Sequence, residues 1–360
     1  MKYFLKTQWM WLLCFLILSL ATITLLLVKT NYEVVTPAMI TSVDDYITIE
    51  GKEDVDIDIN SVSVYGFSKV SVLNYIISVL NPFSNEELLP SYINSSQDYS
   101  VKQGTIHRQK SIDNAIISAY KAAGYEVNIY FDGYTVTTIY TLVTADIELG
   151  DKIIKVNDEE LSLDYSFQQA WSKAYYAGAK SVTCTLKRIV DGKYENKTIE
   201  LEIMNLDQSI TIGVGADCDF SFKVADENAP TFKYNHGESI GPSGGLMQAL
   251  YIYDKLNDGK LTKGLKIAGT GAINHNGDAL LISGTEQKIY ISNACGADIF
   301  FVPIDMTRTK EESQYLNYNE AKKAEEFLKS IGQTKMKIVP VKNLQEAIEY
   351  LEGLQKWFYL

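Results

Sequence analysis

The hydrophobic pattern separates an uncharged N-terminal run from a body of short, alternating elements. Residues 9–28 are almost entirely apolar and carry no charge. A helix over this run is about 30 Å long, at roughly 1.5 Å per residue, which matches the hydrocarbon thickness of a bilayer. The pattern therefore predicts a transmembrane helix over 9–28.

A cleaved signal peptide is the alternative for this run. Its apolar part would be shorter, and a cleavage site with small residues would follow it. The next residues, VKTNYEVV at 28–35, offer no such site. Lys2 and Lys6 precede the run, whereas Lys29 alone follows it closely. The positive-inside rule then predicts a single-pass protein of the cell membrane, with its N-terminus in the cytoplasm and its body outside.

Residues 31–110 are predicted to form a β-rich extracytoplasmic region. Runs rich in Val, Ile and Tyr over 46–50 and 56–67 are typical of strands. Apolar residues at helical spacing predict a helix over 71–80, and the polar, turn-rich stretch 85–104 is expected to be a connector.

Residues 111–205 begin with helical periodicity and continue as a small β-rich module. Glycines end both helical patterns in this region, as expected for helix C-termini. The expected elements are a helix over 111–124, a strand over 134–143, a strand between two turns over 148–161, a helix over 166–178 and a hairpin over 180–203 that turns at Asp191-Gly192.

Residues 208–355 alternate strand-like and helix-like runs, which is typical of an α/β or α+β sandwich. Strands are expected over 209–216, 219–224, 264–273, 298–304 and 335–341, and helices over 244–258, 288–297, 319–332 and 343–357.

Composition narrows the function classes. The 33 Lys and Arg residues against 45 Asp and Glu residues give a net charge of −12, which disfavours nucleic acid as a partner. The three histidines never occur at the spacing of a helical zinc site, and the four cysteines are too scattered for a disulfide framework. The chain contains no phosphate-binding G-x-x-x-x-G-K-[S/T] motif. Neither a cofactor nor a metal is expected.

The segment IGPSGGLMQAL at 240–250 places Ser243 before a helical pattern. Such a serine is either a helix N-cap or a nucleophile. The match to G-x-S-x-G also suggests the nucleophile turn of an α/β-hydrolase, but that turn follows a buried strand, and TFKYNHGESI at 231–240 is polar. His275 is the only histidine after Ser243, and it lies in a turn-like stretch. The sequence therefore offers no well-placed histidine for a Ser-His-Asp triad.

A buried, neutral lysine can replace the histidine as a general base, because burial disfavours the ammonium form. Lys288 follows Ser243 and opens an apolar helical stretch, so it is the candidate base. Thr270 lies between them in sequence and offers a hydroxyl that orients the amine.

The β-rich module resembles a PDZ domain of the kind associated with bacterial proteases. The order of elements resembles that family: a strand, a Leu-Gly-Asp turn, a second strand, a helix and two further strands. The residues that carry the resemblance are Leu149, Gly150, Asp151, Ile153, Ile154, Val156 and Asn157. It implies that the module captures an extended peptide by strand addition. An ordinary β-hairpin domain is the alternative.

The run from Gly241 to Pro303 resembles the proteolytic domain of the Lon family. The whole chain resembles the membrane-anchored, PDZ-containing Lon-like proteases of Gram-positive bacteria. The resemblance implies that Ser243 is the nucleophile, that Lys288 is the base and that Thr270 orients it. It also places Gly241, Pro242 and Gly244 beside the substrate and the oxyanion. The implied fold class is α+β, with an N-terminal transmembrane helix, a PDZ-like β-rich domain over 111–205 and a Lon-type α/β proteolytic domain over 208–355.

The chain departs from the family pattern at three positions. Gly244 replaces the usual alanine, Ser283 replaces a glycine, and Glu286 stands where a basic residue is common. A carboxylate near Lys288 would raise its pKa, but two positions away on a helix Glu286 should point elsewhere.

The expected function is ATP-independent serine endopeptidase activity on protein or peptide substrates outside the membrane. A homo-hexameric ring is expected from the resemblance alone. The alternative is a membrane scaffold or binding protein whose protease-like domain is weak or inactive.

Overall fold

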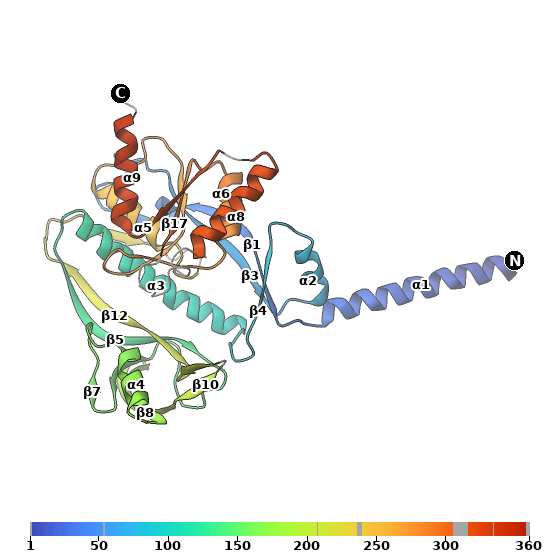
Figure 1. Ribbon diagram of the computed structural model, residues 1–360, viewed down its shortest axis with the longest axis horizontal. Helices are drawn as coiled ribbons and strands as arrows, with labels where there is room; N and C mark the ends of the chain where they lie inside the picture. The colour runs from blue at the N-terminus through green and yellow to red at the C-terminus, as the bar shows by residue number, and fades with distance from the viewer. Residues whose placement is uncertain are drawn as a thin grey trace.

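The computed structural model describes residues 2–52, 55–206, 208–235, 240–304, 316–333 and 335–357 (Figure 1). Helix α1, Lys2–Leu27, projects from the body of the protein (Figure 1). Its segment Gln8–Leu27 is long and apolar enough to cross a membrane. The body is a mixed α+β structure, as expected.

The main sheet combines strands from both ends of the chain. Its order is β18-β17-β14-β3-β1-β4. Strand β3 pairs in parallel with β14 and antiparallel with β1, so the region expected over 31–110 shares one sheet with the region expected over 208–355. The strands are β1 Tyr32–Ser42, β3 Ile59–Ser68, β4 Asn85–Leu88, β14 Ile267–Gly269, β17 Ile299–Pro303 and β18 Lys337–Val341.

Helices cover both faces of this sheet, because the alternating side chains of its strands are apolar on both sides. In β17, Phe301 packs into one core, while Phe300 and Val302 pack into the other. The first core is closed by α3 Gln97–Ala122, α5 Gly245–Leu256 and α9 Leu344–Trp357, and the second by α6 Thr285–Ala294 and α8 Leu316–Ser330.

A second, curled sheet forms the β-rich part of the molecule below α3 (Figure 1). Its order is β12-β5-β6-β8-β9, with β7 paired to β6. The hairpin between β8 and β9 turns at Asp191-Gly192, as predicted, and both residues have positive φ. The elements are β5 Val127–Ile139, β6 Lys152–Val156, β7 Glu159–Glu160, α4 Phe167–Tyr176, β8 Ser181–Val190, β9 Lys193–Glu202 and β12 Val214–Val224.

Strand β12 lies beyond residue 205, yet it pairs with β5 along its whole length. The β-rich sheet therefore extends past the boundary expected from the sequence. The short elements are η1 Val43–Asp45, β2 Ile47–Ile49, α2 Val72–Val79, β10 Met204–Leu206, β11 Ser209–Thr211, β13 Phe232–Tyr234, β15 Ala272–Ile273 and β16 Ala279–Leu280.

The prediction that 85–104 is an irregular connector was wrong. The stretch contains β4 and the first residues of α3, which begins at Gln97. The first residues of α3 are held largely by polar contacts, with few apolar side chains such as Tyr99 packed on the β-rich core. The Gln103 amide donates to the Thr137 carbonyl oxygen at 2.8 Å, and the Tyr99 hydroxyl accepts from the Ile139 amide at 2.7 Å. Hydrophobic periodicity carries no trace of such contacts.

Candidate active site

Ser243 lies in the tight turn that enters α5. Gly244 directly precedes the first residue of α5, and among the described residues no backbone amide donates a hydrogen bond to the Ser243 hydroxyl. The alternative of a simple helix N-cap therefore does not account for this serine. Gly241, with φ +93°, adopts the left-handed conformation that starts the turn.

Hydrogen bonds hold this turn from two sides. The Ser111 hydroxyl donates to the Pro242 carbonyl oxygen at 2.9 Å, from α3. The Gly271 amide donates to the Ser243 carbonyl oxygen at 2.8 Å, from the loop after β14. A side chain at Gly245 would place its Cβ 2.6 Å from the Ser111 hydroxyl oxygen, so close packing at this point requires glycine.

Lys288 is only 2% exposed and lies in the first turn of α6. Its ammonium nitrogen donates to the Thr270 hydroxyl at 3.3 Å and to the Ser283 carbonyl oxygen at 3.0 Å. The Thr270 hydroxyl in turn donates to the Ser243 carbonyl oxygen at 3.2 Å. Thr270 is thus the link between the two residues that the sequence singled out.

Burial lowers the pKa of Lys288 from 10.5 to about 7, because a fully desolvated ammonium is unfavourable. Glu320 acts in the opposite direction by its charge and raises the pKa. The N-terminal end of α6 also disfavours a cation in this turn. The lowered pKa increases the neutral fraction of Lys288 near neutral pH, as a general base requires.

The path of the chain into α6 depends on Gly284. This residue is the N-cap of α6 and has φ +71°. A Cβ there would lie 3.2 Å from a methyl group of Val64 on β3. A glycine thus lets the start of α6 approach the main sheet. Lys288 then lies within hydrogen-bonding distance of Thr270.

The carboxylate that acts on Lys288 is Glu320 on α8 rather than Glu286. The pKa of Glu286 is itself raised, mainly by burial, with Lys323 opposing the shift and Glu320 adding to it. The fully buried Asn317 side chain donates to Glu320 at 3.1 Å and to the Ile282 carbonyl oxygen at 2.7 Å. Asn317 and Glu320 were missed from the sequence, because nothing in a helical pattern of mixed charges marks them.

Only one of the three residues expected at the oxyanion has a free amide there. The Gly241 amide donates to the Gly104 carbonyl oxygen at 2.9 Å, and Pro242 has no N–H group. Within the described residues, the amides of Ser243 and Gly244 have no hydrogen-bond acceptor. These two N–H groups, at the positive end of α5, are the candidates for binding an oxyanion.

The two described histidines, His275 and His107, contact other residues. The imidazole of His275 packs edge-to-face on Phe220, and burial lowers its pKa. His107 faces Asp217 from α3, with 3.6 Å between Nδ1 and Oδ2, and burial also lowers its pKa. His236 falls outside the described residues. Among those described, no cluster of three or more His, Cys, Asp or Glu side chains is arranged to hold a metal ion.

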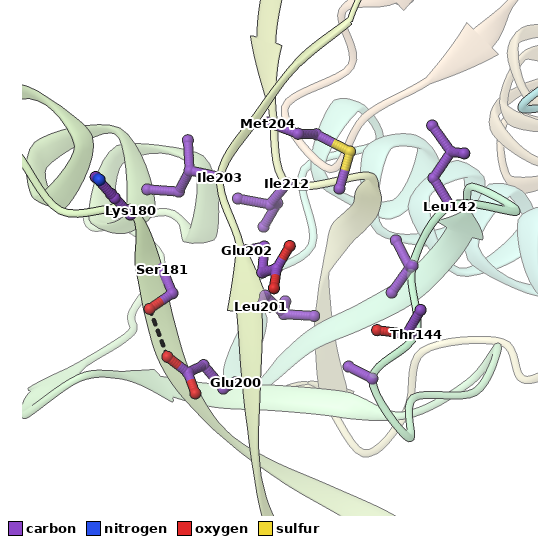
Figure 2. Close-up of a pocket in the computed structure, with 12 residues that line it drawn as sticks. Leu142, Thr144, Lys180, Ser181, Glu200, Leu201, Glu202, Ile203, Met204 and Ile212 are labelled. Carbon is purple, nitrogen blue, oxygen red and sulfur yellow. Dashed lines mark hydrogen bonds between the residues drawn. The ribbon is translucent and has the colours of Figure 1, made fainter.

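The β-rich part contains a cavity of about 480 Å³ (Figure 2). Leu201 in β9 and Ile203 directly after it line the cavity, and Ile212 lines it from the turn before β12. Glu200 and Glu202 add negative charge at the rim, where Glu200 accepts a hydrogen bond from Ser181. None of the residues that line this cavity is a sequence neighbour of Ser243, Thr270 or Lys288.

No protein-family model matches this chain, and a search of the curated proteins found no similar protein. The PDZ-like and Lon-like identities therefore stay predictions.

Proposed function

We propose that this protein is an ATP-independent serine endopeptidase of the Lon-like kind, with Ser243 as nucleophile and Lys288 as general base. The observation that carries the proposal is the environment of Lys288. Its amine is fully buried, its pKa is lowered to about 7, and its hydroxyl partner Thr270 also binds the Ser243 backbone.

In the proposed reaction, neutral Lys288 accepts the proton of the Ser243 hydroxyl as the serine oxygen attacks the peptide carbonyl. The amides of Ser243 and Gly244 stabilise the oxyanion that forms. The ammonium of Lys288 then protonates the leaving amine, and an acyl-enzyme remains. Water, deprotonated by the same lysine, hydrolyses the ester and regenerates Ser243.

Thr270 has a positioning role in this proposal. Its hydroxyl accepts a hydrogen bond from Lys288 and donates one to the Ser243 carbonyl oxygen, so it fixes the distance between the two segments. A direct hydrogen bond between the Ser243 hydroxyl and Lys288 is absent from the described structure. Catalytic contacts of this kind often tighten only when substrate binds.

The cellular arrangement is also part of the proposal. We place the body outside the cytoplasmic membrane, anchored by α1, with the β-rich part presenting protein segments to Ser243. Protease added to intact cells should then digest the body. Protection of the body, or its release as a cleaved secreted form, would contradict this topology.

The central experiment is labelling of the full chain in nanodiscs with a serine-reactive fluorophosphonate, followed by digestion of an unfolded protein without ATP or magnesium. Ser243→Ala should lose both labelling and digestion. Ser172→Ala, on α4, is the matched control and should keep both. Labelling that survives in Ser243→Ala would show that another residue is the nucleophile.

The missing contact between the Ser243 hydroxyl and Lys288 favours one second candidate, a membrane scaffold whose protease-like part is inactive. It would bind unfolded protein in the same assay without cleaving it, and Ser243→Ala would not change this binding.

A further inference from the structure

Helix α2 has an inverted distribution of apolar and polar side chains. Ser78, on its inner side, is 5% exposed, whereas Ile77 is 56% exposed and Leu80, the C-cap residue, is 78% exposed. Ile76 and Val79 are exposed as well. A helix that faces water shows the opposite pattern, with its apolar side chains inward. The outer face of α2 therefore needs an apolar partner.

The backbone fixes α2 beside the end of α1. The Val72 amide donates to the Val28 carbonyl oxygen at 2.9 Å, and the Thr30 amide donates to the Val70 carbonyl oxygen at 2.8 Å. Thus α2 begins beside the end of the membrane-spanning segment, as Figure 1 shows. If α1 spans the bilayer, α2 lies at its surface.

The charge pattern around α2 fits a position at the surface of the bilayer. Residues 70–85 contain no charged residue and no histidine. Lys29 follows α1 and Lys69 precedes α2, so both flank the place where these two helices meet, and both are exposed. Lysines at such positions meet lipid phosphates, while the uncharged stretch between them meets the boundary of the acyl chains.

We propose that the outer face of α2 inserts into the membrane interface and holds the candidate active site of this protein against the bilayer. The partner of this face is lipid. The position of α2 beside the end of α1, fixed by backbone hydrogen bonds, selects lipid over a second copy of the chain or another protein.

A groove of about 850 Å³ runs from the start of α2 toward the candidate active site and ends at neighbours of that site, without being lined by Ser243, Thr270 or Lys288. Lys29 and Ile77 line it beside the membrane, and Val64 and Ile240 line it farther along. Val64 packs against the Gly284 turn that positions Lys288, and Ile240 is three positions before Ser243. Resting on the proposed function, this geometry assigns the substrate class: segments of membrane-anchored proteins close to the bilayer surface.

The first test needs no activity. Single cysteines replace Leu80 or Ile77 in the full chain, in a background without the four native cysteines, and carry an NBD fluorophore in nanodiscs. Ile189→Cys, on β8, is the matched control, because Ile189 is 62% exposed but belongs to the β-rich part. Lipids with a spin label near the headgroup should quench the probes at Leu80 and Ile77 at least threefold more than the probe at Ile189. Equal quenching at all three sites overturns the proposal, and so does protection from a water-soluble quencher without quenching by lipid, which indicates a protein partner.

The second test addresses the substrate class. Val79→Asp with Leu80→Asp, at two exposed positions of α2 that do not line the groove, should reduce cleavage of a peptide tethered to lipid by about tenfold and leave cleavage of the free peptide unchanged, while Ile189→Asp changes neither. Equal losses on both peptides overturn the substrate assignment. Cleavage of neither peptide by the unmodified protein refutes the proposed protease function and leaves the result of the quenching test standing.

Discussion

Two lysines are buried to the same extent in this protein, each 2% exposed, but their surroundings differ. Lys255, on α5, forms a salt bridge with Asp44 at 3.0 Å and donates to the carbonyl oxygen of Val55. Lys288, on α6, donates to the hydroxyl of Thr270 and to one carbonyl oxygen.

The difference shows how a fold distinguishes a lysine that stabilises the structure from one that is suited to act as a base. A carboxylate at contact distance compensates the desolvation of an ammonium, and the Lys255–Asp44 pair thereby ties α5 to η1. Neutral acceptors compensate it less, so Lys288 loses its proton near neutral pH. The predictions below test whether this contrast separates catalysis from stability.

The largest effect is expected on catalysis. Lys288→Met should reduce peptide cleavage about 1000-fold or more, because no base remains to activate Ser243. Lys288→Arg should be equally inactive, since a guanidinium stays protonated. Lys255→Met and His275→Ala are the controls and should keep the turnover number per folded molecule. Cleavage that survives in Lys288→Met but disappears in His275→Ala would show that the serine works through a histidine.

The second effect is on stability, where substitution of the two lysines should change the free energy of unfolding in opposite directions. Lys288→Met should stabilise the fold by about 1–4 kcal/mol at pH 6, because it removes an uncompensated buried amine. Lys255→Met should destabilise it by about 1–3 kcal/mol, because it removes the salt bridge with Asp44 and leaves the carbonyl oxygens of Lys52 and Val55 without this donor. Thermal unfolding in nanodiscs measures both.

The sign of the pH dependence follows from the lowered pKa of Lys288. The unfolded chain binds this proton more tightly, so the penalty is complete below about pH 7 and is relieved as the pH rises toward 10.5. The stability advantage of Lys288→Met should therefore shrink with rising pH. An advantage that is constant from pH 6 to 9 would contradict the assignment of a neutral lysine.

The third effect concerns Thr270. Thr270→Val keeps the shape of the side chain but removes both hydrogen bonds, so we expect a loss of about 10- to 100-fold in the turnover number with little change in KM. Thr270→Ser should restore most of the activity, since it keeps the hydroxyl. A valine variant as active as the unmodified protein would remove Thr270 from the mechanism.

The smallest effect is on the pH profile. Cleavage should rise about tenfold between pH 6 and pH 8, because the neutral fraction of Lys288 increases through a pKa of about 7. Glu320 raises the pKa of Lys288, so Glu320→Gln should move the midpoint to lower pH. Glu286→Gln is the matched control on α6 and should leave it in place. A midpoint that follows Glu286 instead would mean that the wrong carboxylate has been assigned.

The sequence by itself determined the features that depend on local pattern. The uncharged run at 9–28 predicted the apolar helix α1, since a bilayer-length apolar segment is visible in any single sequence. The alternation over 208–355 predicted β17, β18, α5 and α9, because each buries a regular apolar face. Ser243, Thr270 and Lys288 were chosen from motif and residue chemistry; the structure links Lys288 through Thr270 to the Ser243 backbone, and their catalytic roles stay predictions.

Only the tertiary structure decided what depends on partners distant in sequence. The pairing of β3 with β14 joins residues about 200 positions apart, and no local periodicity encodes which strands become neighbours. Ser111 and Asn317 give no sign in the hydrophobic pattern, because each acts by donating a hydrogen bond to a carbonyl oxygen of another segment. The low pKa of Lys288 has the same origin: a lysine in a sequence is a solvated cation, and only the packing of α6 against the main sheet removes the water that keeps it charged.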